Sequence, residues 1–298
     1  MTIRKVGIIG TGTMGLSMAH VCAEAGREVV AVKATPGSTE KAQQSLDKSL
    51  GRIVERGKME AAEKDAIMER ISFSTEETAV GDCDLIIESV IEDIGTKKDL
   101  FRRLEEVCRP DALLTTNTST LSVTAMMAVC KHRGRVAGLH FFNPAPVMGL
   151  VEVIHAFETS DATIETLIAF CQEIGKDPVL VQDTTGFIVN RLLTPYMLNA
   201  IRMLERGTGT IDSIDNAMKW GAAHPMGPFE LADYIGLDVV EAMSTNIYMD
   251  VRSEHHAPPH TLTRLVQLGY LGRKTGKGFY DYSQKPPKPN PDLLHPVI

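Results

Sequence analysis

The N-terminal part of the chain alternates between short apolar runs and an amphipathic segment. Apolar, β-rich runs cover residues 5–9 and 28–32, and the segment 16–25 between them has a helical pattern that ends at Gly26. Continuous apolar runs of this length are typical of strands that are buried on both faces. Three more runs continue the alternation, at 84–90, 112–116 and 136–141. The pattern predicts βαβ units with a parallel sheet.

The pattern changes near residues 183–187, and beyond this point strand-like runs are rare. Helical patterns dominate instead, over 188–205, 211–220 and 230–249. We therefore predict an α/β fold in two domains. The N-terminal domain, residues 1–185, is Rossmann-like with a doubly wound, mostly parallel sheet, and the C-terminal domain, residues 186–298, is all-helical. The proline-rich segment after Ser283 is expected to be extended or disordered.

A glycine-rich loop follows the first apolar run directly. It reads Gly10-Thr11-Gly12-Thr13-Met14-Gly15. Between a strand and a helix, the first glycine makes the tight turn, the second lets the backbone approach a pyrophosphate, and the third allows close helix–strand packing. Amides at the start of the helix then hold the phosphates. The loop predicts a dinucleotide site.

The second strand ends at Lys33, where dinucleotide-binding folds usually carry an acidic residue that accepts hydrogen bonds from the adenosine ribose. An ammonium group cannot accept these bonds, but it can pair with a 2′-phosphate. NADP is therefore an alternative to NAD. In the other interpretation Lys33 points into solvent, and Thr35 or the backbone holds the ribose. The sequence leaves both open.

A second chemical feature lies between residues 138 and 154. An apolar run carries His140, a Pro/Gly-rich turn follows, and a second apolar run carries Glu152. If the two runs pair as antiparallel strands, the carboxylate can hold the imidazole as a general base near neutral pH. The alternative is a core histidine near a hairpin and a surface glutamate.

Polar side chains also follow the central strands. Glu92, Asn117 and Ser119 come just after apolar runs, and the ends of such strands line the ligand crevice of an open parallel sheet, so we expect them near the reactive end of a cofactor. The hydroxyl cluster around Ser119 is equally suited to cap the next helix. A basic cluster at 48–58 is either a solvated helix face or a contact for a phosphorylated ligand.

Composition narrows the choice of partners. The 298 residues carry a formal net charge of −7, with 43% hydrophobic and 23% charged residues, which is ordinary for a globular protein and disfavours nucleic acid or an anionic membrane as the main partner. No apolar run approaches the roughly 20 residues that span a membrane, and the N-terminus lacks a signal-peptide pattern. Five scattered cysteines without CxxC spacing predict no metal site and a reducing, cytoplasmic compartment.

Eight segments, in unbroken order over most of the chain, together form a highly specific pattern. They read GTGTMG at 10–15, IIESVIED at 86–93, NTSTLS at 117–122, GLHFFNPAPVM at 138–148, LVEVI at 150–154, TGFIVNRLL at 185–193, HPMGPFELADYIGLD at 224–238 and GRKTGKGFY at 272–280. In these segments the chain resembles the 3-hydroxyacyl-CoA dehydrogenase family, especially its short, single-function 3-hydroxybutyryl-CoA dehydrogenases. The resemblance implies an NAD(P)-dependent oxidoreductase of fatty acid metabolism.

The resemblance also implies catalytic roles. His140 matches the general base that takes the proton of the 3-hydroxyl group, or the acid in the reverse reduction, and Glu152 matches the partner that stabilises its imidazolium. Ser119 and Asn190 match the donors that hold the substrate oxygens.

Further positions match binding residues of the family. Those expected to bind the cofactor are Gly10, Thr11, Gly12, Thr13, Met14, Gly15, Lys33, Glu92, Lys97, Ser119, Asn143 and Lys274. Those expected to bind the acyl-CoA substrate are Ser49, Arg56 (or its neighbour Lys58), Ser119, Asn143 and Asn190. Two positions depart from the family pattern, because Lys33 replaces the usual aspartate and Ser89 the usual alanine.

The sequence thus predicts interconversion of a 3-hydroxyacyl-CoA, with 3-hydroxybutyryl-CoA as the expected substrate, and the 3-oxoacyl-CoA by hydride transfer to or from NAD or NADP. One alternative is a dehydrogenase that acts on a hydroxyacyl-carrier protein or a sugar acid. Another is a non-catalytic nucleotide-binding relative. The helical domain is expected to close over the substrate and to form a homodimer.

Overall fold

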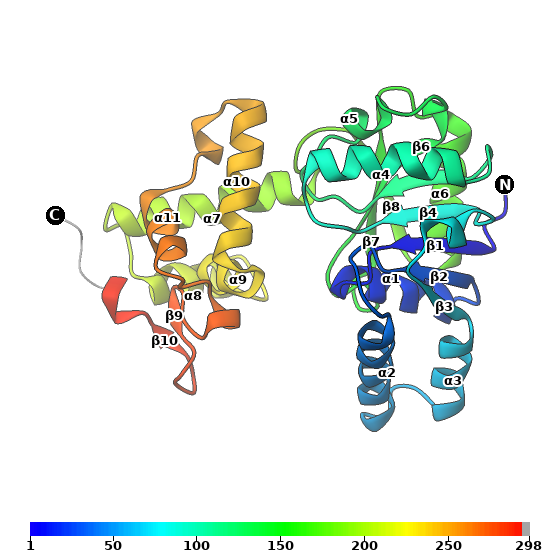
Figure 1. The fold of residues 1–298 in the computed structure, drawn as a ribbon. Coiled ribbons are helices and arrows are strands. Elements are labelled where there is room, and N and C mark those ends of the chain that lie inside the picture. Colours follow the sequence, from blue (N-terminus) through cyan, green and yellow to red (C-terminus); the bar gives the residue numbers. More distant parts are fainter. Residues whose placement is uncertain (294–298) are drawn as a thin grey trace. The chain divides into compact units, whose positions relative to one another are not determined.

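The structure is a computed structural model that describes residues 1–293. The chain forms two compact units, one from Met1 to Phe187 and a second that begins at Ile188. This division lies close to the predicted boundary after residue 185. Within the described residues, no helix has the length and apolar character needed to cross a membrane. The units are described separately below (Figure 1).

The first unit is built on an eight-stranded sheet. Its strands are β1 (Lys5–Ile9), β2 (Glu28–Val32), β3 (Ile71–Ser74), β4 (Leu85–Glu88), β5 (Leu113–Thr116), β6 (Val136–Phe141), β7 (Leu150–His155) and β8 (Asp177–Gln182). They lie in the order β3-β2-β1-β4-β5-β6-β7-β8, and every neighbouring pair is parallel except β6 and β7. The predicted doubly wound, mostly parallel sheet is confirmed.

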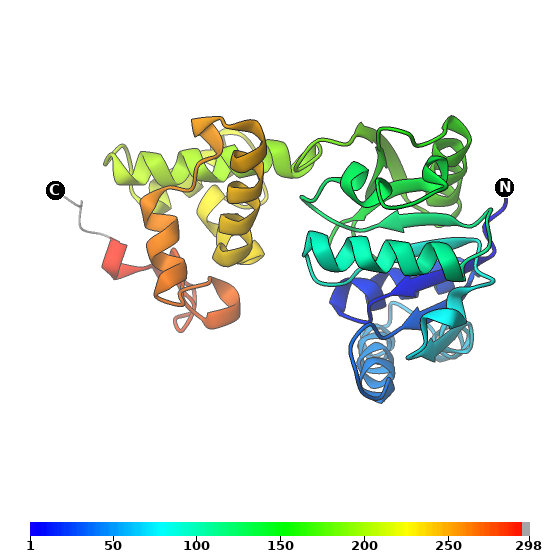
Figure 2. The same cartoon turned by 45° about the horizontal axis from the view of Figure 1, so that its top comes forward.

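Helices cover both faces of this sheet (Figures 1 and 2). They are α1 (Thr13–Glu24) and α6 (Asp161–Glu173) on one face, and α4 (Ile94–Val107) and α5 (Val123–Met127) on the other. Successive side chains of a strand point to opposite faces, so Ile8 packs in the α1 and α6 cluster while Ile9 packs in the α4 and α5 cluster. Burial on both faces explains why the central strands read as unbroken apolar runs.

A helical hairpin projects from the edge of the first unit (Figure 1). It consists of α2 (Glu40–Glu55) and α3 (Ala61–Glu69), and its apolar side chains Leu46 and Leu50 join the α1 cluster. The break between the two helices falls at Gly57, whose φ of 65° lies in the left-handed region that glycine adopts without strain. The segment around the basic cluster at 48–58 therefore forms two antiparallel helices.

The second unit is helical, as predicted. Its helices are α7 (Val189–Glu205), α8 (Ile211–Gly221), α9 (Pro228–Ile235), α10 (Leu237–Val251) and α11 (His260–Gln267). A short antiparallel pair, β9 (Tyr280–Asp281) and β10 (Lys288–Pro289), adds strand structure that the prediction of an all-helical domain did not contain. The segment after Ser283, expected to be extended or disordered, is held in place at Asn290, which is fully buried and whose side chain donates to the carbonyl of Gly278 at 2.8 Å. The rest of that prediction, residues 294–298, lies outside the described residues.

Two buried carboxylates hold the end of this unit in place. Asp215 accepts hydrogen bonds from the backbone N–H groups of Phe229 (2.8 Å) and Glu230 (3.0 Å) in the first turn of α9, and from the hydroxyl of Tyr280 (2.9 Å). A carboxylate at this place satisfies amides that have no partner within the helix. One side chain thus joins α8, α9 and β9.

Asp233, on α9, is 1% exposed and accepts from the N–H groups of Phe279 (3.0 Å) and Tyr280 (2.9 Å) and from the hydroxyl of Tyr282 (3.1 Å). Gly272 and Gly278 both lie against this residue, where an added Cβ would be 2.3 Å from the Asp233 carbonyl oxygen and 2.1 Å from Oδ1, respectively. Burial outweighs the three hydrogen bonds and raises the pKa of Asp233 to about 6.

We expect this carboxyl group to make stability depend on pH. Its folded pKa of about 6 lies above the unfolded value of about 3.9, so between these values the folded protein binds more protons and stability falls as pH rises. From about pH 4 to about pH 7, the free energy of unfolding of the wild type should fall by up to about 3 kcal/mol relative to Asp233→Asn. Urea titrations of both proteins measure this difference. If the free energy of unfolding of the wild type minus that of Asp233→Asn stayed constant or rose with pH, the assignment would be contradicted.

Candidate active site

The glycine loop has the geometry that its three glycines predict. Gly10 has a φ of 108°, and a Cβ there would lie 2.2 Å from the carbonyl oxygen of Ser89. A Cβ on Gly15 would lie 1.8 Å from the carbonyl oxygen of Gly10, which is the close helix–strand contact. By contrast, a Cβ on Gly12 would meet nothing within 4 Å. The backbone is therefore open only at the second glycine.

This open position adjoins the start of α1. Gly12 is the N-cap residue and has no side chain, so it makes no capping hydrogen bond to the first turn, which begins with Thr13 and Met14. Amides at an uncapped helix start carry partial positive charge and favour a phosphate group. Open space, free of side chains, next to such amides fits the pyrophosphate of a dinucleotide. The residues present therefore fit the cofactor that the sequence predicts.

Lys33 lies just beyond the end of β2 and folds back onto its own loop. Its ammonium group donates to the carbonyl oxygen of Thr35 (2.7 Å), to the Thr35 hydroxyl (2.9 Å) and to the carbonyl oxygen of Pro36. The side chain is thus held within its own loop rather than directed into solvent. Its donors are used by neutral oxygens of the loop.

His140 and Glu152 face each other on neighbouring strands. They are a register pair of the antiparallel strands β6 and β7, and such pairs place both side chains on the same face of the sheet. His140 Nδ1 lies 2.8 Å from Glu152 Oε2. The side chains are 5% and 1% exposed, respectively. The alternative of a surface glutamate is wrong for the side-chain position seen here.

Ser119 completes a row of three groups. Its Oγ lies 3.1 Å from Nε2 of His140, so the imidazole contacts a carboxylate through one nitrogen and a hydroxyl through the other. The rings of Phe142 and Phe187 flank the imidazole, with centroids 4.6 and 5.5 Å away. This apolar setting limits access of water to the polar row.

Glu92 and Lys97 belong to a charge cluster in which Lys97 is buried and Glu92 is exposed. Lys97 is 1% exposed, and its Nζ lies 2.6 Å from Oε1 of Glu88 and 3.3 Å from Oε2 of Glu92. Glu92 Oε1 in turn accepts from the backbone N–H of Ser119 at 3.0 Å and from the hydroxyl of Thr118. Both predicted residues therefore support the segment that carries Ser119.

The turn between β6 and β7 carries the exposed Asn143. Lys176, which precedes β8 and is 8% exposed, donates to the carbonyl oxygens of Ala145 (2.7 Å) and Met148 (2.9 Å) within this turn. Asn117 holds the other side, because its Oδ1 accepts from the backbone N–H of Phe141 at 2.8 Å. The turn that links His140 and Glu152 is thus fixed by side chains from two other segments.

The remaining predicted residues lie elsewhere. Ser49, on α2, and Arg56, at its end, are exposed on the helical hairpin of the first unit. Asn190 is the second residue of α7 and belongs to the second unit. Lys274 also belongs to that unit and pairs with both carboxylate oxygens of Asp238, at 2.5 and 2.6 Å. Within the first unit, the structure brings together His140, Glu152, Ser119, Glu92 and Lys97.

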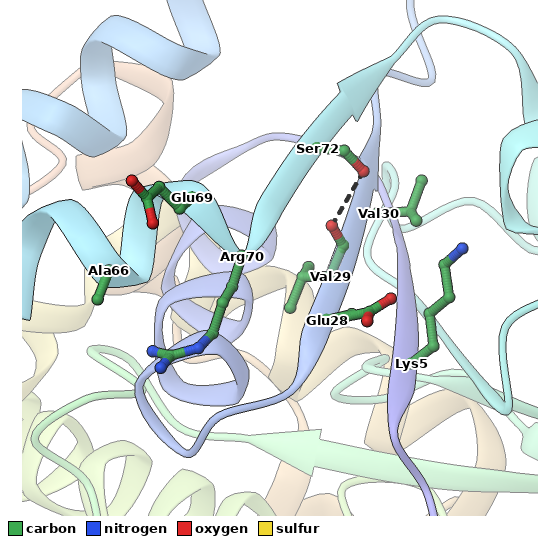
Figure 3. A pocket seen from close by; sticks show the side chains of 8 residues that line it. All are labelled: Lys5, Glu28, Val29, Val30, Ala66, Glu69, Arg70 and Ser72. Carbon is green, nitrogen blue, oxygen red and sulfur yellow. Dashed lines mark hydrogen bonds between the residues drawn. The ribbon is translucent and has the colours of Figure 1, made fainter.

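A separate cavity of about 470 Å³ opens at the amino-terminal ends of β1 and β2 (Figure 3). It is lined by Lys5, Glu28, Val29, Val30, Ala66, Glu69, Arg70 and Ser72. Its two cations already have partners, since Lys5 donates to Asp82 at 2.7 Å and Arg70 to the carbonyl of Ala23 at 3.2 Å. None of the predicted site residues lines it. Gly10, Ser119 and His140 lie at the opposite, carboxyl-terminal ends of β1, β5 and β6.

Family models match both parts of the chain. The 3-hydroxyacyl-CoA dehydrogenase NAD binding domain matches residues 5–184, and the C-terminal domain of the same family matches residues 186–282. The chain belongs to the 3-hydroxyacyl-CoA dehydrogenase family. This confirms the resemblance that the sequence motifs carry.

Relatives in this family match over nearly their full length. A 3-hydroxybutyryl-CoA dehydrogenase of Clostridioides difficile is 41% identical over 94% of this chain and 100% of its own. The human mitochondrial hydroxyacyl-coenzyme A dehydrogenase is also 41% identical, over 94% of this chain and 91% of its own. The crystal structure of (S)-3-hydroxybutyryl-CoA dehydrogenase PaaH1 from Ralstonia eutropha matches this chain with a TM-score of 0.91 and 37% sequence identity. The match covers 95% of this chain and 100% of the PaaH1 chain.

Two residues that support the site in this family member escaped sequence reasoning. Glu88 ends an apolar strand, and a charged residue at the end of such a run is a usable signal, because a buried carboxylate needs a cation or several donors. Lys176 gives no such signal. Its partners are backbone carbonyls of a distant turn, which no local pattern specifies.

We expect substitutions in the glycine loop to separate binding from folding. In Gly12→Ala the new methyl group meets open space, so the thermal midpoint should match the wild type, while affinity for NADH falls about 10-fold or more because the pyrophosphate can no longer approach. In Gly15→Ala the methyl group meets the Gly10 carbonyl, and unfolding free energy should fall by about 1–3 kcal/mol. Nucleotide fluorescence and thermal melts measure both. Wild-type NADH affinity in Gly12→Ala would contradict the role of this glycine.

Proposed function

We propose that this protein interconverts a 3-hydroxyacyl-CoA and the corresponding 3-oxoacyl-CoA with NAD(P), and that 3-hydroxybutyryl-CoA is its substrate. One observation carries the proposal. A buried imidazole lies between a carboxylate and a serine hydroxyl, on the first unit that also holds an open glycine loop for a dinucleotide. The family and the names of the matched relatives support the same reaction.

The histidine tautomer follows from its partners. Glu152 accepts a hydrogen bond from the Nδ1–H group of His140. The lone pair of Nε2 therefore faces Ser119. A substrate hydroxyl next to Ser119 then finds a base that can take its proton. When the imidazole becomes charged, the Glu152 carboxylate stabilises it. In the reverse direction the imidazolium returns the proton to the substrate oxygen.

The nicotinamide of a bound cofactor supplies the hydride acceptor or donor. The protein then needs to hold the substrate oxygen, keep water away and manage one proton. The one O–H of Ser119, which faces Nε2 of His140 here, turns to donate to the substrate oxygen when that oxygen takes its place on Nε2. The rings of Phe142 and Phe187 limit water, and His140 carries the proton. We propose that Asn190, the second residue of α7, is the second hydrogen-bond donor to the substrate oxygens.

We propose that the CoA portion lies along the helical hairpin and the turn after β6. Ser49 and Arg56 are exposed on the hairpin, and a guanidinium group suits the phosphates of CoA. Asn143 is exposed on the turn next to His140, where an amide suits the thioester end of the substrate or the cofactor. Lys274 is proposed to reach the cofactor from the second unit.

We also propose a homodimer that uses the second unit. Large apolar side chains are exposed on its helices, and such surfaces favour protein contacts. They include Leu192, Trp220, Tyr234, Val239 and Met249. A cytoplasmic location and a role in fatty acid metabolism complete the proposal. All five cysteines are buried and free, and burial raises the pKa of the Cys22 thiol to about 12, which suits a reducing compartment.

The proposal predicts that His140→Gln loses turnover but still binds the cofactor. Without the proton carrier, kcat for acetoacetyl-CoA reduction should fall at least about 100-fold, because general acid–base catalysis contributes roughly this much. NADH affinity should stay near the wild-type value, since His140 is not in the glycine loop. The decrease in nicotinamide absorbance measures kcat, and nucleotide fluorescence measures affinity.

The same assay tests the alternatives. Turnover of a carrier-protein thioester or a sugar acid, with none of acetoacetyl-CoA, would favour another substrate class on this scaffold. Dinucleotide binding without turnover of any of these substrates would favour a non-catalytic relative. Wild-type kcat in His140→Gln would show that the base assignment is wrong.

For the cofactor, we propose that the protein accepts NADP as well as NAD. A carboxylate at the end of β2 would hold the ribose and repel a 2′-phosphate, and Lys33 removes both effects. Its ammonium group is bound only by neutral oxygens of its loop, so a phosphate dianion can compete for it.

Lys33→Asp should therefore shift the cofactor preference toward NADH. We expect the ratio of kcat/KM for NADH to that for NADPH to rise about 10- to 100-fold, since one phosphate contact is replaced by charge repulsion. Lys33→Met is the matched control, because it removes the charge without adding repulsion, and it should give a smaller rise. An unchanged ratio in Lys33→Asp would show that this residue does not read the ribose.

A further inference from the structure

The most completely buried charge of the first unit is a carboxylate that the catalytic scheme does not use. Glu88, the last residue of β4, is 0% exposed. Its carboxylate accepts from the backbone N–H of Val90, the Nζ of Lys97 and the hydroxyl of Thr116, each at 2.6 Å. These donors come from the loop after β4, from α4 and from β5. A buried carboxylate is costly without such partners, so the arrangement is held tightly.

Glu88 reaches the Ser119 segment by two routes. On one side, the Thr116 hydroxyl that donates to Glu88 also accepts from the backbone N–H of Thr118 at 3.2 Å. On the other side, Lys97 links Glu88 to Glu92. Glu92 Oε1 then receives the N–H groups of Ser119 at 3.0 Å and of Thr120 at 3.4 Å.

Through these two routes, hydrogen bonds hold the backbone of three consecutive residues, 118–120. Ser119 is the middle one, and its Oγ lies 3.1 Å from Nε2 of His140. Lys97 is shared between two carboxylates, with the buried Glu88 at 2.6 Å and the exposed Glu92 at 3.3 Å, so the charge of Glu88 affects how strongly the ammonium group pairs with Glu92. Removing the Glu88 charge would let Lys97 pair with Glu92 alone and would move the oxygen that receives Ser119 N–H.

We propose that Glu88 is a positioning residue for the reaction: through Thr116, Lys97 and Glu92 it holds residues 118–120 so that the Ser119 hydroxyl lies on Nε2 of His140. It touches neither the substrate oxygen nor the imidazole. It acts only through Ser119. The kinetic part of this inference rests on the proposed function, whereas the structural part does not.

Glu88→Gln keeps the shape of the side chain and removes its charge. We expect kcat to fall about 10- to 100-fold with the KM for acyl-CoA nearly unchanged, because a misplaced catalytic group slows the chemical step more than binding. Thr115→Val is the matched control. Thr115 is 1% exposed on the same sheet and donates only to the carbonyl of Ile86 at 2.7 Å, so its loss should lower stability but leave kcat unchanged.

A double-mutant cycle with Ser119→Ala decides whether the effect passes through Ser119. If it does, Glu88→Gln adds little to the loss that Ser119→Ala causes. If the two losses multiply, Glu88 acts elsewhere and the proposal is overturned. Should Glu88→Gln fold poorly, Thr116→Val breaks one of the two routes with nearly no change in shape, and the same cycle applies to it.

A spectroscopic measurement separates this inference from the proposed function. In the cofactor-free protein, the ¹⁵N chemical shift of His140 Nε2 reports the hydrogen bond to Ser119. Glu88→Gln should move this shift in the direction that Ser119→Ala does, while Thr115→Val should leave it in place. This result is expected even if acetoacetyl-CoA is not the substrate. A shift that Ser119→Ala changes and Glu88→Gln does not would overturn the positioning role.

Discussion

His140 and Glu152 meet because β6 and β7 run antiparallel inside a sheet that is otherwise parallel. Parallel neighbours need a long crossover, whereas an antiparallel pair needs only a turn, so the two residues can be close in the chain and opposite in register. The close packing of Gly138 against Ile154, where a Cβ would lie 2.7 Å from the isoleucine Cβ, leaves room for few other registers. The contact between His140 and Glu152 is thus a consequence of one strand direction.

The second consequence is electrostatic. Once the imidazole and carboxylate are buried on the sheet, every polar group beside them loses water and needs a partner. The buried Glu88 and Lys97 are partners of each other, and the exposed Glu92 adds a second carboxylate. These three side chains carry a net negative charge, which backbone and hydroxyl donors share. Lys176 does the same for the turn carbonyls, and burial lowers the pKa of its ammonium group.

Features that depend on neighbouring residues could be predicted from the sequence. The glycine loop needs only a strand, a turn and a helix in succession, and the His140–Glu152 pair needs only a hairpin, so both follow from short segments. The edge strands β3 and β8 were not predicted. In β3 apolar and polar residues alternate over only four positions, and the apolar run of β8 is short and mostly exposed. The order of the C-terminal segment depends on Asp233 and Gly278, which lie far apart in the chain. Partnerships such as that of Lys97 with Glu88 combine non-local segments and escape any local pattern.

Lys33 shows the same limit for charge. The sequence shows that a lysine replaces the usual carboxylate at the position that would face the ribose. The effect of the ammonium group, however, depends on which oxygens take its three protons, and in this loop they are neutral oxygens of Thr35 and Pro36. A neutral acceptor binds a cation less strongly than a phosphate does. A phosphate group on a ligand can therefore replace these oxygens as the partner of the Lys33 ammonium group. Residue type alone thus sets what a side chain can bind, and the backbone around it sets what that ligand must displace.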